Sequence, residues 1–264
     1  MPTTLLTVLG FTVIFAATTA GAALVFFFKN DISEKLNTLF LGFAAGVMIA
    51  ASVWSLLIPS IEEAERGGMG KWSFVPAAIG FLIGGLFLVL LDRVVPHFHP
   101  GTGQEEGVHS SLHKTVKMFF AVTIHNVPEG LAVGFAFGGA ALIGTTEAAF
   151  AALGLAIGIA IQNLPEGAAV ALPFKQVTGS RAKAFLFGMG SGAVEPVAAV
   201  IGFFLATSLA AAQPWFLSFA AGAMIFVVAE DLIPDAKLAD HPHLGTWGVM
   251  AGFSLMMVLD VALG

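Results

Sequence analysis

The chain has 264 residues, of which 57% are hydrophobic and only 11% are charged, and its mean hydropathy is +0.91. This composition is typical of an integral membrane protein. Because the sequence contains no cysteine, disulfides and thiolate metal ligands are excluded. The formal net charge of -6, with no basic patch, argues against nucleic-acid binding. We also expect no organic cofactor, since no nucleotide-binding loop motif is present.

Eight apolar segments are each long enough to cross a bilayer, and they leave almost no residues for a soluble domain. They cover residues 5–28, 39–59, 74–95, 115–142, 149–172, 184–210, 214–234 and 246–263. We therefore predict an all-α integral membrane protein in which one transmembrane domain occupies residues 1–264. A His-containing cytoplasmic loop, residues 96–114, is expected to join the third and fourth helices.

Basic residues are concentrated in alternate loops, which predicts the orientation of the chain. The loops after the even-numbered segments hold only Arg66 and Lys71. The loops after the odd-numbered segments hold Lys29, Lys35, Arg93, Lys114, Lys117, Lys175, Arg181, Lys183 and Lys237. By the positive-inside rule, the odd loops face the cytoplasm and both termini face outside.

Two pairs of segments resemble each other within the chain. Residues 43–49 and 219–225 have nearly the same sequence, and both stretches run on to an Ile-Pro pair, Ile58-Pro59 and Ile233-Pro234. The members of each pair would cross the membrane in opposite directions, as in inverted repeats with a substrate site near the midplane. The alternative is that Ala- and Gly-rich helices resemble one another by composition alone.

The second internal pair is a polar motif that occurs twice, as residues 125–130 and residues 162–167. On a helix, His125 and Glu129 project from one face, and Gln162 and Glu166 repeat that spacing. An asparagine stands three residues before each glutamate, at Asn126 and Asn163. Each motif contains a proline, Pro128 or Pro165, which should kink its helix beside these polar groups.

Helix rise places both motif copies and one further carboxylate near a single depth. At ~1.5 Å per residue, His125 and Glu195 lie roughly 15 and 17 Å from the cytoplasmic ends of their helices, and Gln162 lies roughly 20 Å from the outer end of its own. A charged residue at the centre of a membrane helix costs about 2.5 to 3.5 kcal/mol, so three carboxylates at one level need a partner. Imidazole, carboxylate and amide ligands suit Zn²⁺, with Fe²⁺, Mn²⁺ and Cd²⁺ as further candidates. The alternative is a polar cluster or proton relay without metal.

Three stretches, HNVPEGLAVG from residue 125, QNLPEGAAVA from residue 162 and GAVEP from residue 192, resemble the ZIP (Zrt/Irt-like) metal transporters of the bacterial type. The resemblance covers essentially the whole chain. It implies an eight-helix bundle in a bacterial inner membrane, with both termini outside. It also implies that divalent metal moves into the cytoplasm while a transport domain slides against a second domain, in an elevator-type motion.

The resemblance also implies a two-metal centre. The first ion would be held by His125, Glu129, Gln162 and Glu166, with Met48 as an added ligand. The second ion would be held by Asn126, Glu129, Asn163, Glu166 and Glu195. Many eukaryotic members have His where Gln162 stands, and some bacterial members have Asp where Asn163 stands. These departures leave open the zinc selectivity of the site and the occupancy of its second position.

Other polar residues near the helix ends are candidates for a metal pathway. Ser55 and Glu62, at the outer end of the second helix, could gather cations before entry. On the cytoplasmic side the candidates for an exit are Asp92, His97, His99, Glu230 and Asp231, the last two by resemblance. The alternative in each case is a solvated charge or an ordinary soluble loop.

The leading hypothesis is a membrane transporter whose substrate is a divalent metal, and a homodimer is a further expectation. The alternative enzyme would be an intramembrane zinc-dependent hydrolase, in which the metal activates water. Such a site should contain two or three histidines, whereas only His125 lies within a membrane segment and HExxH is absent. A proton- or sodium-linked carrier is another alternative, since carboxylates serve those ions too.

Overall fold

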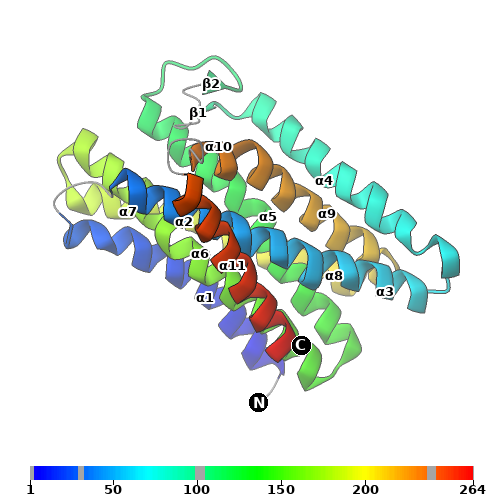
Figure 1. Ribbon diagram of the computed structural model, residues 1–264. Helices are drawn as coiled ribbons and strands as arrows, with labels where there is room; N and C mark the ends of the chain where they lie inside the picture. Colours follow the sequence, from blue (N-terminus) through cyan, green and yellow to red (C-terminus); the bar gives the residue numbers. More distant parts are fainter. Residues whose placement is uncertain (1–2, 29–32, 99–104, 237–241, 264) are drawn as a thin grey trace.

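The computed structural model describes residues 3–28, 33–98, 105–236 and 242–263. Long helices run side by side as one bundle (Figure 1). The described part contains eight helical spans that are long and apolar enough to cross a membrane, as the sequence predicts. The second span is the largest departure from the predicted bounds, because it covers Glu34–Arg66 and so includes the acidic segment that follows residue 59.

Most helices follow one another with short connections, and the loop between α4 and α5 is the longest. In chain order they are α1 (Thr3–Ala23), η1 (Leu24–Phe26), α2 (Glu34–Ala51), η2 (Ser52–Leu57), α3 (Ile58–Arg66), η3 (Gly70–Trp72), α4 (Phe74–Val94), α5 (Lys114–Ile143), α6 (Thr146–Thr178), α7 (Arg181–Gly192), α8 (Val194–Ser208), η4 (Ala210–Ala212), α9 (Gln213–Val227), η5 (Val228–Leu232), α10 (Ile233–Asp235) and α11 (Pro242–Leu263).

The two helices that were predicted to be related share an irregularity. In both, an α-helix passes into a π-helical segment, η2 or η5, directly before the Ile-Pro pair that opens α3 or α10. A proline inside a helix removes one hydrogen bond and crowds the preceding turn, and a π-turn is one way to absorb that strain. The sequence similarity of the two stretches therefore extends to their local structure.

The sixth predicted helix differs from its expectation. Its regular hydrogen bonding is interrupted at Ala193, whose backbone stays in the right-handed helical region, so the span is divided into α7 and α8. Pro196 lies in the first turn of α8, where its missing amide hydrogen costs little. The break places the amino end of α8, which carries Glu195, inside the bundle.

The helices fall into two groups by their closest packing. In the first group α1 packs on α6, α5 packs on α8, and α7 lies against α6 and α1; in the second, α2 packs on α11 and α4 on α9. Backbones touch within each group: an added Cβ at Gly134 would collide with the carbonyl of Ala199, and one at Gly84 with that of Phe219. Small residues permit such close helix contact, as the spacing of Gly80 and Gly84 predicts.

The His-containing loop predicted between the third and fourth helices lies between α4 and α5 and contains two short strands. Strands β1 (His97–Phe98) and β2 (Glu105–Glu106) pair in antiparallel fashion, and β1 lies against α5. The loop therefore has structure of its own in its described residues. His99 lies outside the residues that the structure describes.

The first residues of α1 and the last residues of α11 lie at the same end of the bundle (Figure 1). An even number of membrane spans requires this arrangement. The side of the membrane that this end faces stays a prediction from the basic loops.

Candidate metal centre

Both copies of the polar motif lie in the middle of long helices and are buried. Asn126 and Glu129 on α5, and Gln162 and Asn163 on α6, are fully inaccessible to solvent, and Glu166 is 9% exposed. The helices α5 and α6 continue without interruption through the prolines of the motifs. Buried polar groups at this depth require partners, because water is not available to them.

Direct hydrogen bonds join the two copies to each other and to α8. The Nε2 of Gln162 donates to the Oε1 of Glu129 at 2.5 Å and to the Oδ1 of Asn163 at 3.2 Å. The Nδ2 of Asn163 in turn donates to the Oε2 of Glu195 at 2.6 Å. Residues that the sequence places near one depth are therefore in contact across three helices.

The break between α7 and α8 provides a partner for the remaining asparagine. The Nδ2 of Asn126 donates to the backbone carbonyl of Ser191 at 2.9 Å. That carbonyl belongs to the last turn of α7, just before the interruption at Ala193. Asn126 is thereby fixed with its amide nitrogen toward α7.

Four buried oxygen atoms in this cluster are left without donors. They accept no hydrogen bond from any part of the chain that the structure describes, and they are Asn126 Oδ1, Glu129 Oε2, Gln162 Oε1 and Glu166 Oε2. A buried acceptor without a partner is costly, and such groups are rare in folded proteins. Carboxylate and amide oxygens are suitable ligands for a divalent cation, which would satisfy all four.

The charges of the cluster also favour a cation. Glu129 interacts electrostatically with Glu166 and Glu195, and Glu166 interacts with His125. Within residues 3–28, 33–98, 105–236 and 242–263, no three His, Asp or Glu side chains stand close enough to hold an ion by themselves. An ion held here therefore needs the amide oxygens as well as the carboxylates.

His125 is held from the second group of helices. Its Nε2 lies 2.9 Å from the Oδ2 of Asp231 in the π-helical segment η5. Both residues line a cavity of about 280 Å³, and Phe98 of β1 in the lining places this cavity toward the end of the bundle that carries the α4–α5 loop. Its lining also includes Asn37, Phe98, Glu166 and Asp235. The candidate metal site is thus reached from this end.

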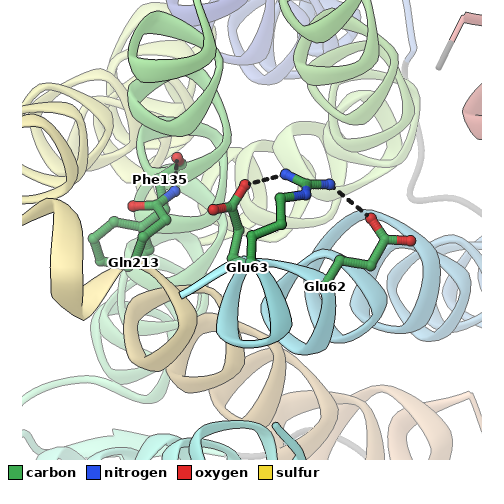
Figure 2. Close-up of polar contacts among 5 residues, drawn as sticks. Glu62, Glu63, Phe135 and Gln213 are labelled. Carbon is green, nitrogen blue, oxygen red and sulfur yellow. Dashed lines mark hydrogen bonds and ion pairs between the residues drawn. The ribbon is translucent and has the colours of Figure 1, made fainter. Parts of the chain in front are cut away.

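A second cavity, of about 330 Å³, lies toward the opposite end. Figure 2 shows part of its wall, where Arg66 joins Glu62 at 3.2 Å and Glu63 at 2.6 Å. The Nε2 of Gln213, at the start of α9, donates to the carbonyl of Phe135 on α5 at 2.9 Å. Among the described residues, those that line this cavity belong to neither motif copy.

The two predicted entrance residues, Ser55 and Glu62, both line this second cavity. The hydroxyl of Ser55 donates to the Oδ1 of Asp260 on α11 at 2.7 Å. Asp260 is an acidic neighbour that the sequence did not single out.

Of the predicted exit residues that the structure describes, Asp231 lines the first cavity, whereas Asp92, His97 and Glu230 do not. Asp92 and Glu230 line a separate space of about 280 Å³ together with Arg93. His97 is fully buried, with its Nδ1 2.8 Å from the carbonyl of Val95 and its Nε2 3.6 Å from the Oδ1 of Asp92. His99 cannot be placed, since it lies outside the described residues.

Met48 is fully buried in the main apolar core, where it belongs to the same cluster as Leu56 and Met224. The residues that line the cavity at His125 include Leu41 and Asn37 from α2, about two and three turns before Met48. The role of Met48 as a metal ligand stays a prediction.

Sequence reasoning missed several polar residues that touch the site or line its cavities, among them Asp235 and Thr18. Asp235 lines the cavity four residues after Asp231, and that helical spacing was the available signal. Thr18 on α1 donates its hydroxyl to the Oε1 of Glu195 at 2.8 Å. Nothing in the first apolar segment distinguishes Thr18 from its neighbour Thr19.

The model of the ZIP zinc transporter family matches residues 4–118 and 115–260 of the chain. The chain belongs to this family. Its relatives include zinc transporter ZIP11 of Homo sapiens, 37% identical over 94% of both chains. Zinc transporter ZIPB of Bordetella bronchiseptica is 39% identical over 97% of this chain and 81% of its own length. Zinc transporter GufA of Myxococcus xanthus is 34% identical over 94% of this chain and 96% of its own.

Family membership confirms the class of function. The chain is a multi-pass membrane protein that transports divalent metal, and zinc is the metal of its family. It is a transporter and not an enzyme, so the hydrolase alternative is wrong.

Proposed function

We propose that the chain moves zinc into the cytoplasm through a site built from the two motif copies. The ligands of the ion are His125, Glu129, Gln162 and Glu166, and the side-chain amide oxygen Oδ1 of Asn126 lies beside them. The observation that carries this proposal is the set of four buried oxygens that have no donor among the described residues, next to a cavity that reaches His125 and Glu166. The same ligands would accept Cd²⁺, Fe²⁺ and Mn²⁺.

The two cavities support transport by alternating access. One cavity reaches the site from the end predicted to be cytoplasmic, whereas the lining of the other includes neither motif copy within the described residues. This arrangement corresponds to an inward-facing state. The ligands lie on α5 and α6 in the first group of helices, so a sliding of that group against the second would carry them between the two cavities.

Two polar contacts cross between the groups and would change during such a motion. On the inner side His125 contacts Asp231, and on the outer side Gln213 donates to the carbonyl of Phe135. An elevator-type motion has to break both contacts.

The acidic residues of the cavities provide a path for the cation. Ser55, Glu62 and Asp260 would receive it on the outer side, since an acidic opening raises the local concentration of cations. Asp231 and Asp235 would receive it on the inner side, with Asp92, His97 and Glu230 nearby. A homodimer and placement in a bacterial inner membrane stay predictions.

Zinc flux into liposomes tests the proposal. The protein is reconstituted with a zinc-sensitive dye inside the vesicles, and wild type is compared with Glu129→Gln and Glu166→Gln, which keep the shape of the side chain. A matched control is Glu147→Gln, an exposed glutamate in the first turn of α6. We expect both site variants to lose flux and the control to keep it. Flux in both site variants equal to that of wild type would contradict the assignment.

A further inference from the structure

Glu195 differs from the other carboxylates of the cluster because both of its oxygens are engaged. The hydroxyl of Thr18 donates to Oε1 at 2.8 Å and the Nδ2 of Asn163 donates to Oε2 at 2.6 Å. All three side chains are completely buried. Hydrogen bonds to a carboxylate are among the stronger ones in proteins, so this carboxylate is held in place by its neighbours.

The packing of α1 holds Thr18 in the position that this contact needs. An added Cβ at Gly167 on α6 would collide with the carbonyl of Thr18, and one at Gly192 on α7 would meet the Thr18 side chain at 2.7 Å. The threonine therefore lies between two glycines on two different helices. Its hydroxyl also contacts the carbonyl of Ile14 at 3.3 Å, and a β-branched side chain has few rotamers in a helix.

The partner on the other side of Glu195 is also fully used. Asn163 directs its amide nitrogen to Glu195 and to the carbonyl of Ile14 at 3.4 Å, while its Oδ1 accepts from Gln162. A second ion bound to Asn163 and Glu195 would have to share their oxygens with these hydrogen-bond donors or displace the donors. The four open oxygens offer a cation a place that requires no such change.

We propose that Thr18, Asn163 and Glu195 form a hydrogen-bonded triad in the place of a second ion, so that this chain carries one divalent metal ion at a time. Thr18 is a positioning residue that acts through Glu195. This inference rests on the proposed function, because it assumes that the first ion binds at Glu129 and Glu166. It predicts that the amide of residue 163 decides the number of ions: an aspartate there supplies no donor to Glu195 and adds a carboxylate that a second cation would stabilise.

Equilibrium binding of zinc to the purified protein in lipid nanodiscs tests the number of ions. The double variant Glu129→Gln/Glu166→Gln is the reference, and its bound zinc is subtracted to remove ions held elsewhere on the surface. We expect wild type to bind one more zinc per chain than the reference, and Asn163→Asp to bind two more. Wild type that binds two more, or Asn163→Asp that binds only one more, would overturn the triad. If wild type and reference bind equally, the proposed site itself is wrong.

Flux measurements test the role of Thr18 separately. In Thr18→Val the shape is kept and the donor is lost, whereas Thr18→Ser keeps the donor. We expect zinc uptake to fall roughly tenfold or more in the valine variant, as when a buried carboxylate loses one charged hydrogen bond, and to return in the serine variant. Uptake that stays at the wild-type level in the valine variant, or that falls equally in both variants, would overturn the positioning role.

Discussion

The polar cluster contains two kinds of buried carboxylate, Glu129 and Glu166 in the motif copies and Glu195 on α8, which differ in their hydrogen bonds. Glu129 and Glu166 each keep a buried oxygen that accepts no hydrogen bond within the described residues. Glu195 has a donor on each oxygen, from Thr18 and from Asn163. A carboxylate with a donor on each oxygen is held in place by its neighbours, whereas one that keeps an oxygen without a donor can offer that oxygen to a cation.

The largest expected effect comes from removing one carboxylate of each kind, one with an oxygen that lacks a donor and one with a donor on each oxygen. We expect Glu129→Gln to weaken zinc binding about a hundredfold or more and Glu195→Gln about tenfold, since partners behind the ligands contribute less than the ligands themselves. Isothermal titration of the purified variants measures both values. Equal losses in the two variants would remove the distinction between the two kinds of carboxylate.

Single cysteines sharpen the comparison of the two cavities, since the natural chain has none. Ala169 and Ala151 both lie on α6, and they line the inner and outer cavities respectively. In oriented vesicles, a membrane-impermeant thiol reagent should label Ala169→Cys from the cytoplasmic side and Ala151→Cys from the outside. Labelling of both from one side would contradict the assignment of the cavities.

A variant at the contact between His125 and Asp231 tests whether the rate of transport changes more than the affinity for zinc. Asp231→Asn removes the negative charge of a carboxylate whose Oδ2 lies 2.9 Å from the Nε2 of His125. This contact holds the imidazole toward the second group of helices. We expect the maximal rate of zinc uptake to change about fivefold, with a smaller change in zinc affinity, because contacts in a buried charged pair are worth one to three kcal/mol. Asp235→Asn, which alters the same cavity four residues further on, is the matched variant and should have the smaller effect.

The smallest expected effect concerns the outer cavity. The guanidinium of Arg66 lies between Glu62 and Glu63, and its side chain is 58% exposed. Arg66→Gln should raise uptake at low zinc concentration by about twofold, because exposed ion pairs contribute little and are screened by salt. The increase should disappear at high ionic strength, and an increase that persists there would point to a cause other than charge.

The sequence predicted the spans, and it indicated which residues form the polar cluster, because both depend on local patterns. Hydropathy identifies each apolar helix, and the four-residue spacing puts His125 and Glu129 on one face of α5. The duplicated motif then indicates that α6 carries the partner residues. Helix rise was sufficient to place Glu195 near the same depth, and the structure brings it into contact with Asn163.

What the sequence missed depends on contacts between helices that are distant along the chain. Nothing within residues 3–23 indicates that Thr18 meets Glu195, since this contact results from close packing against glycines of α6 and α7. The division of the sixth helix at Ala193 was missed because its hydropathy is continuous. The direction in which Asn163 turns its amide likewise follows from its neighbours and not from the motif.

X-ray absorption at the zinc edge tests the central claim most directly, namely that one ion is held by nitrogen and oxygen ligands from the two motif copies. The purified protein is loaded with zinc, and wild type is compared with His125→Ala. We predict a first shell of nitrogen and oxygen at about 2.0 to 2.2 Å, with imidazole scattering that disappears in the variant and without zinc–zinc scattering. Imidazole scattering unchanged in His125→Ala, or a zinc–zinc distance in wild type, would contradict the account.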